Sequence, residues 1–333
     1  MIPKTTGAYI FGCQGPVLTQ DEAAFFKETQ PLGFILFARN IDNPDQVRPL
    51  TASLRAAVGW QAPILIDQEG GRVQRLRAPH WREWLPPLDQ MQTARDAVRS
   101  MELRARIIAH ELFEVGIDVN CTPTADLTTA DTHPFLRNRT LGPAPEQVIA
   151  AARAVVAGQL AGGVLSVVKH IPGHGRGTSD SHHDLPTVTT DRATLEGTDF
   201  AVFKALRDVP LGMTAHVVYS AIDPEAPATT SPILHRVIRD DIGFDGLLMT
   251  DDLSMNALPG DIPTRARDSM RAGCDVVLHC NGNRAEMAAV VDATGTLLPK
   301  AYDRAEAALA LRQPPAALDI SAVEADLEAL LNG

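Results

Sequence analysis

Residues 164–186 read VLSVVKHIPGHGRGTSDSHHDLP, and this stretch decides the fold. Its first five residues are apolar or small, which is typical of a strand buried on both faces of a parallel sheet. Glycines, histidines and aspartates follow directly, and parallel α/β proteins place their chemistry at the carboxyl ends of strands. The glycines at 173, 175 and 177 favour positive φ and mobility, so we expect Asp180 and His182 to lie on a mobile lid.

Apolar segments alternate with helical patterns along the whole chain. The expected strands are Ala8–Cys13, Phe34–Arg39, Pro63–Asp67, Asp118–Thr122, Val164–His170, Gly212–Val218, Gly246–Asp251 and Asp275–Cys280. Strands joined by crossover helices pair in parallel, and eight such units most simply close into a (β/α)8 barrel of the TIM type. An open, doubly wound sheet is the alternative fold.

The expected helices lie between these strands and after the last one. They are Asp21–Thr29, Pro44–Val58, Ala94–Val115, Pro145–Ala161, Arg192–Arg207, Pro232–Asp240, Pro263–Ala272, Ala285–Leu297, Tyr302–Leu311 and Ala322–Leu331. The last three are expected to finish and cap the barrel, so that residues 1–333 form one domain. Segment 125–142 is too long for an ordinary connection and is expected to be a functional loop. The Pro-Pro pair at 86–87 is expected to mark a turn.

Composition limits the class of partner. A net charge of -11 argues against nucleic acid or an anionic membrane and favours a small or neutral molecule. The first residues lack the pattern of a signal peptide, and no apolar run approaches the ~20 residues that span a bilayer, so we expect a cytoplasmic protein. The four cysteines fall in or beside expected strands without C-x-x-C spacing, which predicts buried, reduced thiols.

Polar or ionisable side chains follow nearly every expected strand. They are Arg39, Asn40, Asp67, Asp126, Lys169, His170, His216, Asp251 and His279. A single aspartate after a strand can be a helix N-cap, and a single histidine can be satisfied within a core. Their recurrence on strand after strand instead favours a polar pocket at one end of the barrel.

Three kinds of chemistry can be weighed for the 170–183 segment. A metal site is disfavoured because the histidines are spread through a glycine-rich loop and no H-E-x-x-H is present. The Gly-x-Gly-x-Gly spacing matches neither phosphate-binding pattern. Acid–base and nucleophilic chemistry without metal or cofactor remains. Asp180 can hold one ring nitrogen of His182, which exchanges a proton at the other, while Asp251 acts as nucleophile, as in retaining glycosidases.

Three segments carry a resemblance to a known family. They are Lys169–Gly175 followed by Asp180-Ser181-His182, the segment 249–255 (MTDDLSM), and the segment 66–75 (IDQEGGRVQR). Together they resemble the signature of family 3 glycoside hydrolases, specifically the single-domain bacterial β-N-acetylhexosaminidases that recycle cell-wall fragments. With segments 33–37 and 215–217, the similarity covers most of residues 8–280.

The resemblance implies roles for single residues. The first aspartate of Thr-Asp-Asp-Leu is the family's nucleophile, which selects Asp251 over Asp252. His182 is implied as general acid/base and Asp180 as the residue that orients it.

The resemblance also implies the residues that bind the sugar. Asp67, Arg75, Lys169 and His170 match binders of sugar hydroxyls, as their donors and acceptors allow. An arginine of segment 125–142 is also expected to bind the sugar. Arg139 matches best, although Thr140-Leu141 departs from the small residue and aromatic that usually follow, and Arg137 is near. Arg72 is left open between a structural and a binding role.

The implied activity is removal of terminal β-linked N-acetylglucosamine from cytoplasmic (anhydro)muropeptides by a monomeric enzyme, through a covalent glycosyl-aspartate. Many larger relatives carry an acid/base on a second domain. This chain ends soon after its eighth strand, so we expect the proton donor on a barrel loop. Two alternatives stay open: a phosphorylase, because histidine does not repel phosphate, and a sugar-binding barrel without catalysis.

Overall fold

The computed structural model describes residues 1–179, 181 and 184–332. Its main feature is a closed barrel of parallel strands in the spatial order β1-β11-β10-β7-β5-β4-β3-β2. The strands are β1 (Gly7–Gly12), β2 (Pro31–Leu36), β3 (Ile64–Ile66), β4 (Val119–Asn120), β5 (Leu165–Ile171), β7 (Leu211–Thr214), β10 (Leu247–Asp252) and β11 (Val276–His279). The predicted (β/α)8 barrel is therefore confirmed.

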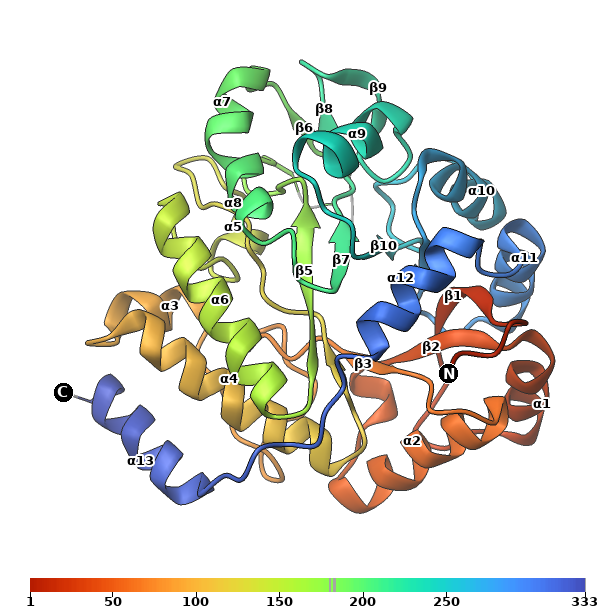
Figure 1. Cartoon of the computed structure of the whole chain (residues 1–333), viewed down its shortest axis with the longest axis horizontal. Helices are drawn as coiled ribbons and strands as arrows, with labels where there is room; N and C mark the ends of the chain where they lie inside the picture. The colour runs from red at the N-terminus through yellow and green to blue at the C-terminus, as the bar shows by residue number, and fades with distance from the viewer. Residues whose placement is uncertain (180, 182–183, 333) are drawn as a thin grey trace.

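Helices surround the barrel (Figure 1). They are α1 (Gln20–Thr29), α2 (Pro44–Val58), α3 (Pro87–Thr93), α4 (Ala97–Glu114), α5 (Pro134–Arg137), α6 (Pro145–Ala161), α7 (Arg192–Gly197), α8 (Asp199–Ala205), α9 (Pro232–Arg236), α10 (Ile262–Ala272), α11 (Arg284–Thr294), α12 (Pro299–Leu309) and α13 (Ile320–Leu331). Local sequence sets their ends. For example, α1 begins at a capping box in which Thr19 and Glu22 bond each other's backbone N–H groups, and α2 ends at Gly59 with φ of 74°.

Two expected strands have different bounds. The strand predicted at Phe34–Arg39 lies earlier, as β2, because Ala38–Asn40 forms a 3-10 helix, η1. The strand predicted at Gly212–Val218 ends at Thr214. The chain then enters a separate three-stranded sheet, which consists of β6 (Thr187–Val188), β8 (Val218–Tyr219) and β9 (Asp223–Pro227).

Three helical predictions are also corrected. The helix expected at Arg192–Arg207 is broken at Thr198, whose φ of -126° and ψ of -88° separate α7 from α8. Helix α9 runs directly into a π-helical turn, η2 (Val237–Asp241). The Pro-Pro pair at 86–87 begins helix α3, because proline is tolerated in a first helical turn.

Helix α12 closes the amino end of the barrel. Its Ala305 and Ala308 pack among inward side chains of the strands, including Leu32 and Leu247. Helix α13 lies beside α4 at the edge of the molecule (Figure 1), where its Leu327 is buried. In the described part of the chain, no helix combines the length and hydrophobicity needed to cross a membrane.

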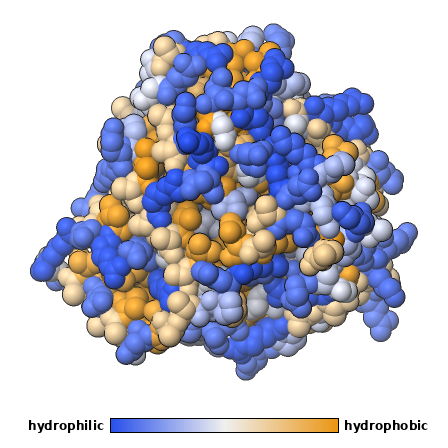
Figure 2. Space-filling view, viewed as in Figure 1, coloured by the Kyte–Doolittle hydropathy of each residue, from blue (hydrophilic) through white to orange (hydrophobic). Residues whose placement is uncertain are grey.

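Two further features are the distribution of hydrophobic residues on the surface and the burial of the cysteine thiols. On the face drawn in Figure 2, hydrophobic residues lie in small groups among hydrophilic ones. All four cysteines are free and buried, as the sequence predicted.

Candidate active site

A cleft of about 830 Å³ opens at the carboxyl end of the barrel. The predicted nucleophile and all the predicted sugar-binding residues line it: Asp67, Arg75, Arg139, Lys169, His170 and Asp251. Asp180 and His182, the predicted acid–base pair, lie outside the described residues. Ser181, between them in the sequence, also lines the cleft.

Strand alternation places three of these side chains at the bottom of the cleft. Successive strand residues point to opposite faces, and Leu65, Leu165, Val167, Leu247 and Met249 all lie in the cluster that fills the barrel interior. Asp67, Lys169 and Asp251 are the next members of the same inward series. Because the apolar residues that precede them on the same strands are buried inside the barrel, these three charged side chains also point toward the barrel axis.

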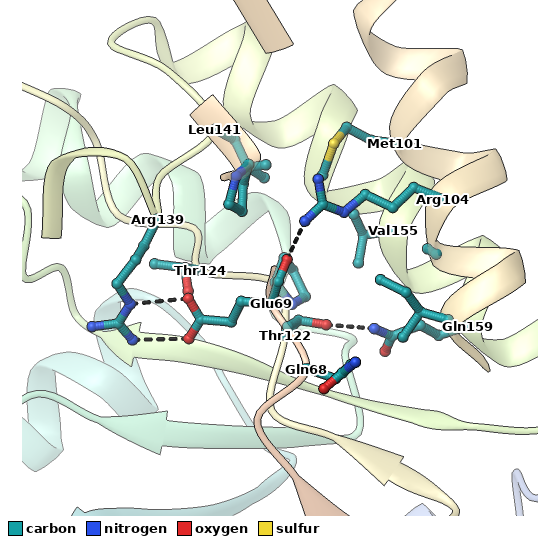
Figure 3. Close-up of a pocket in the computed structure, with 14 residues that line it drawn as sticks. Gln68, Glu69, Met101, Arg104, Thr122, Thr124, Arg139, Leu141, Val155 and Gln159 are labelled. Carbon is teal, nitrogen blue, oxygen red and sulfur yellow. Dashed lines mark hydrogen bonds and ion pairs between the residues drawn. The ribbon is translucent and has the colours of Figure 1, made fainter. Parts of the chain in front are cut away.

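A chain of alternating charges runs from the cleft to Glu69 behind it. The Lys169 Nζ atom lies 2.8 Å from Asp67 Oδ1 and 2.6 Å from Glu69 Oε1. Asp67 also accepts a hydrogen bond from Arg75 at 3.2 Å. Arg139 binds Glu69 with Nε and Nη2, both at 2.9 Å (Figure 3).

These pairs control the protonation states. Burial alone would raise the pKa of Asp67, but Lys169 and Arg75 outweigh it and lower that pKa. The pKa of Glu69 is likewise held below its usual value against burial, by Arg139 and Lys169. Both carboxyl groups are therefore ionised at neutral pH.

One carboxylate oxygen of Asp251 accepts a hydrogen bond, and no described residue donates one to the other oxygen. Oδ1 accepts the backbone N–H of Asp252 at 2.8 Å, while Oδ2 lies 3.9 Å from His170 Nε2, beyond hydrogen-bond distance. Burial would raise the pKa of Asp251, but His170 and His216 oppose it, and the pKa falls to about 2. Asp251 is thus an ionised carboxylate that lines the cleft, with an oxygen that accepts no hydrogen bond from the described residues.

Asp252 is engaged instead in holding the backbone. Its Oδ1 accepts N–H groups of Ser254 and Cys280, both at 3.1 Å, and its Oδ2 accepts the Ser254 hydroxyl. These bonds tie the end of β10 to the residue that follows β11.

His170 is oriented by a carboxylate behind it. Asp126 Oδ2 lies 2.7 Å from His170 Nδ1, and Asp126 Oδ1 accepts the His174 N–H at 2.6 Å. This contact turns Nε2 of His170 toward Asp251. His174 is fully buried, and burial lowers its pKa to about 4, so it is neutral at pH 7.

Residues 173–177 are packed against their surroundings, while Asp180 and His182, which the expected mobile lid would carry, lie outside the described residues. The mobility of this lid stays a prediction. Of the three glycines, only Gly173 has a positive φ, 140°. A Cβ at Gly175 would lie 1.8 Å from the Leu127 carbonyl oxygen, and the Gly175 carbonyl accepts the Thr132 hydroxyl at 2.6 Å. Arg176 also donates to the buried Asp199 at 2.7 Å. The glycines here serve close packing.

Several residues predicted from strand ends do not line the cleft: Arg39, Asn40, Asp126, His216 and His279. Arg39 donates to the Cys13 carbonyl at 3.0 Å, and His279 lies 3.1 Å from Glu286. Asp126 and His216 instead lie behind the site.

The two candidate arginines of segment 125–142 differ in position. Arg139 lines the cleft, whereas Arg137 donates to backbone carbonyls of its own loop, including Ala130 at 2.6 Å. Arg72 lines the cleft, with its guanidinium 4.1 Å from the centre of the Phe135 ring.

Sequence reasoning assigned no role to Glu69, and it missed Phe37 and Phe135 as cleft residues. The available signal for Glu69 was its position two residues after Asp67 in the 66–75 motif. In the part of the chain that the structure describes, no three His, Cys, Asp or Glu side chains form a group that could hold a metal ion.

Fold and site together define a barrel enzyme whose pocket sets ionised carboxylates beside cationic donors, an arrangement suited to a polyhydroxylated ligand. The family model described as Glycosyl hydrolase family 3 N terminal domain matches residues 14–307, and the chain belongs to this family. A β-hexosaminidase of Alkalilimnicola ehrlichii is 38% identical over 283 residues, which is 83% of this chain and 81% of that protein. The chain is thus a glycoside hydrolase of the β-hexosaminidase type.

Solved structures agree. NagZ from Neisseria gonorrhoeae, in complex with N-trifluoroacetyl-D-glucosamine, is similar with a TM-score of 0.85 and 31% identity over 99% of this chain and 100% of that one. A family 3 β-N-acetylglucosaminidase from Paenibacillus has a TM-score of 0.81 and 32% identity over 97% of this chain, which spans 62% of that longer protein.

Proposed function

We propose that the enzyme removes terminal β-linked N-acetylglucosamine from (anhydro)muropeptides by a retaining double displacement with Asp251 as nucleophile. The observation that carries this proposal is the state of Asp251, an ionised carboxylate at the bottom of the cleft whose Oδ2 accepts no hydrogen bond from the described residues. Asp252 lacks that freedom because backbone N–H groups and a hydroxyl occupy its oxygens.

The sugar would be held by the charge chain and by His170. Asp67 accepts from adjacent hydroxyls, and Lys169, Arg75 and Arg139 donate to others. N-trifluoroacetyl-D-glucosamine in the complex of the Neisseria gonorrhoeae relative supports an N-acylated glucosamine as the bound sugar.

Two steps complete the reaction. Asp251 Oδ2 forms a bond to the anomeric carbon as the glycosidic oxygen departs with a proton from His182, which Asp180 orients. Water then attacks the glycosyl-aspartate, gives its proton to His182, and frees Asp251. The roles of Asp180 and His182 rest on the family resemblance, and the presence of Ser181 in the cleft supports them.

We further propose a monomer that works in the cytoplasm. The four buried, free thiols fit a reducing compartment, and the net charge of -11 fits a neutral sugar better than a nucleic acid or an anionic membrane.

Covalent labelling tests the nucleophile. A slow 5-fluoro analogue of N-acetylglucosaminyl fluoride should modify the peptide that contains Asp251, located by mass spectrometry. Asp251→Ala should lower kcat for an aryl N-acetyl-β-glucosaminide by at least about a thousandfold. A label on another peptide, or near-normal turnover by the variant, would refute the assignment.

Product analysis tests the reaction and the substrate. With a disaccharide muropeptide, we expect free N-acetylglucosamine whether or not inorganic phosphate is present. Sugar 1-phosphate would instead identify a phosphorylase, and no cleavage of the muropeptide alongside aryl glycoside turnover would reject the natural substrate.

A further inference from the structure

Glu69 is a buried carboxylate that lies behind the cleft. It does not line the cleft, and it lines a smaller pocket between the barrel and α4, drawn in Figure 3. Arg139 lines both spaces and donates two hydrogen bonds to the Glu69 carboxylate. Glu69 therefore reaches the cleft through the residues that it contacts.

Those partners are two cations of the cleft. The Glu69 carboxylate accepts two hydrogen bonds from Arg139 and lies 2.6 Å from Lys169 Nζ. All three side chains are at least nine-tenths buried, with exposed fractions of 1% for Glu69, 8% for Arg139 and 2% for Lys169. Glu69 is the counter-ion that these two cations share.

The geometry also decides which donors remain free. An ammonium has three N–H donors: Lys169 donates one to Asp67 at 2.8 Å, and its Nζ forms an ion pair with Glu69 at 2.6 Å. A guanidinium has five, and Arg139 directs two at Glu69. Glu69 thus fixes each cation so that its remaining donors can face a ligand.

The backbone of Glu69 is itself held tightly. Its N–H donates to the Val73 carbonyl at 2.9 Å, and its carbonyl accepts from Arg104, which also donates to Gln90 at 2.8 Å (Figure 3 draws the Arg104 contact). The next residue, Gly70, has a φ of 106°, and a Cβ there would lie 1.8 Å from Arg104 Nη2. These contacts fix the backbone position from which the Glu69 side chain extends.

We propose that Glu69 is the positioning and specificity-determining residue of the cleft, which orients Arg139 and Lys169 and neutralises them so that they bind a neutral sugar rather than an anion. Without the Glu69 charge, the two adjacent buried cations would lose the carboxylate that contacts both, and Asp67 and Asp251 would balance them less closely. Such a pair attracts sulfate or phosphate, which accept charge-assisted hydrogen bonds from both. The inference rests on the proposed function, because it takes the cleft as the sugar site.

The test is Glu69→Gln, which removes the charge and keeps the volume. We expect KM for 4-nitrophenyl N-acetyl-β-glucosaminide to rise at least about tenfold, with a smaller change in kcat. Sulfate should inhibit the variant competitively at concentrations that leave the wild type unaffected, at constant ionic strength. Partial unfolding would lower kcat and would create no sulfate site. Absence of either effect overturns the proposal.

Two further variants complete the design. Glu22→Gln makes the same change at a buried glutamate of α1 outside the cleft, and should leave KM and sulfate sensitivity unchanged. Glu69→Asp keeps the charge and withdraws it by one methylene, so KM should rise without sulfate inhibition. This variant replaces Glu69→Gln as the test if Glu69→Gln fails to fold. An unchanged KM would then overturn the proposal. Labelling of wild-type Asp251 tests the proposed function separately.

Discussion

Asp251 combines deep burial with an unusually acidic carboxyl group. Burial would raise its pKa, yet the imidazoles of His170 and His216, the Asp252 N–H and Lys169 together lower that pKa to about 2. A group with a depressed pKa in the folded state keeps its charge until the pH falls through that value. The candidate nucleophile therefore remains ionised far below neutral pH.

This protonation state predicts a flat pH dependence for the first covalent step. With a 5-fluoro glycosyl fluoride, whose leaving group needs little protonation, the inactivation rate should change less than about twofold between about pH 7 and about pH 4. The measurement is time-dependent loss of activity after preincubation at each pH. A rate that falls with a midpoint near pH 4 would mean that Asp251 has an ordinary pKa.

The sequence could choose Asp251 over Asp252 only through the family resemblance. Leu247, Leu248 and Met249 are all apolar because both faces of a barrel strand are buried, so alternation is not visible in the residue types. The structure resolves it by placing Leu247 and Met249 inside the barrel, in register with Asp251. Glu69 was missed for a related reason, since a buried ion pair depends on partners distant in sequence.

At the scale of elements, the glycine segment and the 125–142 loop form one packed unit. Gly175 presses against the Leu127 backbone, and the Thr132 hydroxyl bonds the Gly175 carbonyl. The sequence predicted a functional loop at 125–142 and a glycine-rich segment at 173–177. It could not predict that the two would pack against each other. A glycine permits mobility and close approach equally, and only the neighbour decides between them.

Gly175→Ala should accordingly destabilise the fold. Its new methyl group would meet the Leu127 carbonyl oxygen at 1.8 Å, a backbone atom that cannot move independently. We expect a loss of about 3 kcal/mol in the free energy of unfolding, measured by urea denaturation.

The matched control is Gly197→Ala at the end of α7, where an added Cβ meets no atom within 4 Å. It should be neutral or stabilising by about 0.5 kcal/mol. Wild-type stability of Gly175→Ala with a selective fall in kcat would instead support the predicted mobile lid.

Short elements mark the limit of prediction at this scale. The apolar strands and amphipathic helices were predicted because each buries a continuous face. Helix η1 has only 3 residues, and the strands of the β6-β8-β9 sheet have two to five. Elements this short show no periodic pattern in the sequence. The break at Thr198 could not be predicted from the sequence, because the residues on both sides of it keep helical periodicity.

Across the whole molecule, charged networks occupy both ends of the barrel but do different work. At the carboxyl end, Asp126 is buried behind the cleft and holds His170 and His174. At the amino end, Asp275 is 5% exposed and accepts from Arg304 at 2.8 Å and from Arg239 at 2.7 Å. The eight strand-and-helix units in the sequence predicted the barrel. The sequence did not predict that α12 would place Arg304 beside Asp275, the residue before β11, because this contact forms only when the barrel closes.

The same substitution at the two ends should therefore separate stability from activity. Asp275→Asn leaves two arginines with a weakened partner and should lower the free energy of unfolding by about 3 kcal/mol, while kcat and KM stay within about twofold. Asp126→Asn should lower kcat/KM at least about tenfold, because the imidazole of His170 loses the carboxylate that orients it.

Urea denaturation and steady-state kinetics on an aryl N-acetyl-β-glucosaminide measure both variants. Temperature must stay below the unfolding transition of the weaker variant, so that kinetic differences do not report unfolded enzyme. If Asp275→Asn reduced kcat/KM as strongly as Asp126→Asn, the amino end of the barrel would be coupled to the cleft, and the division of labour between the two ends would be wrong. If Asp126→Asn left kcat/KM unchanged, His170 would be held by the cleft alone.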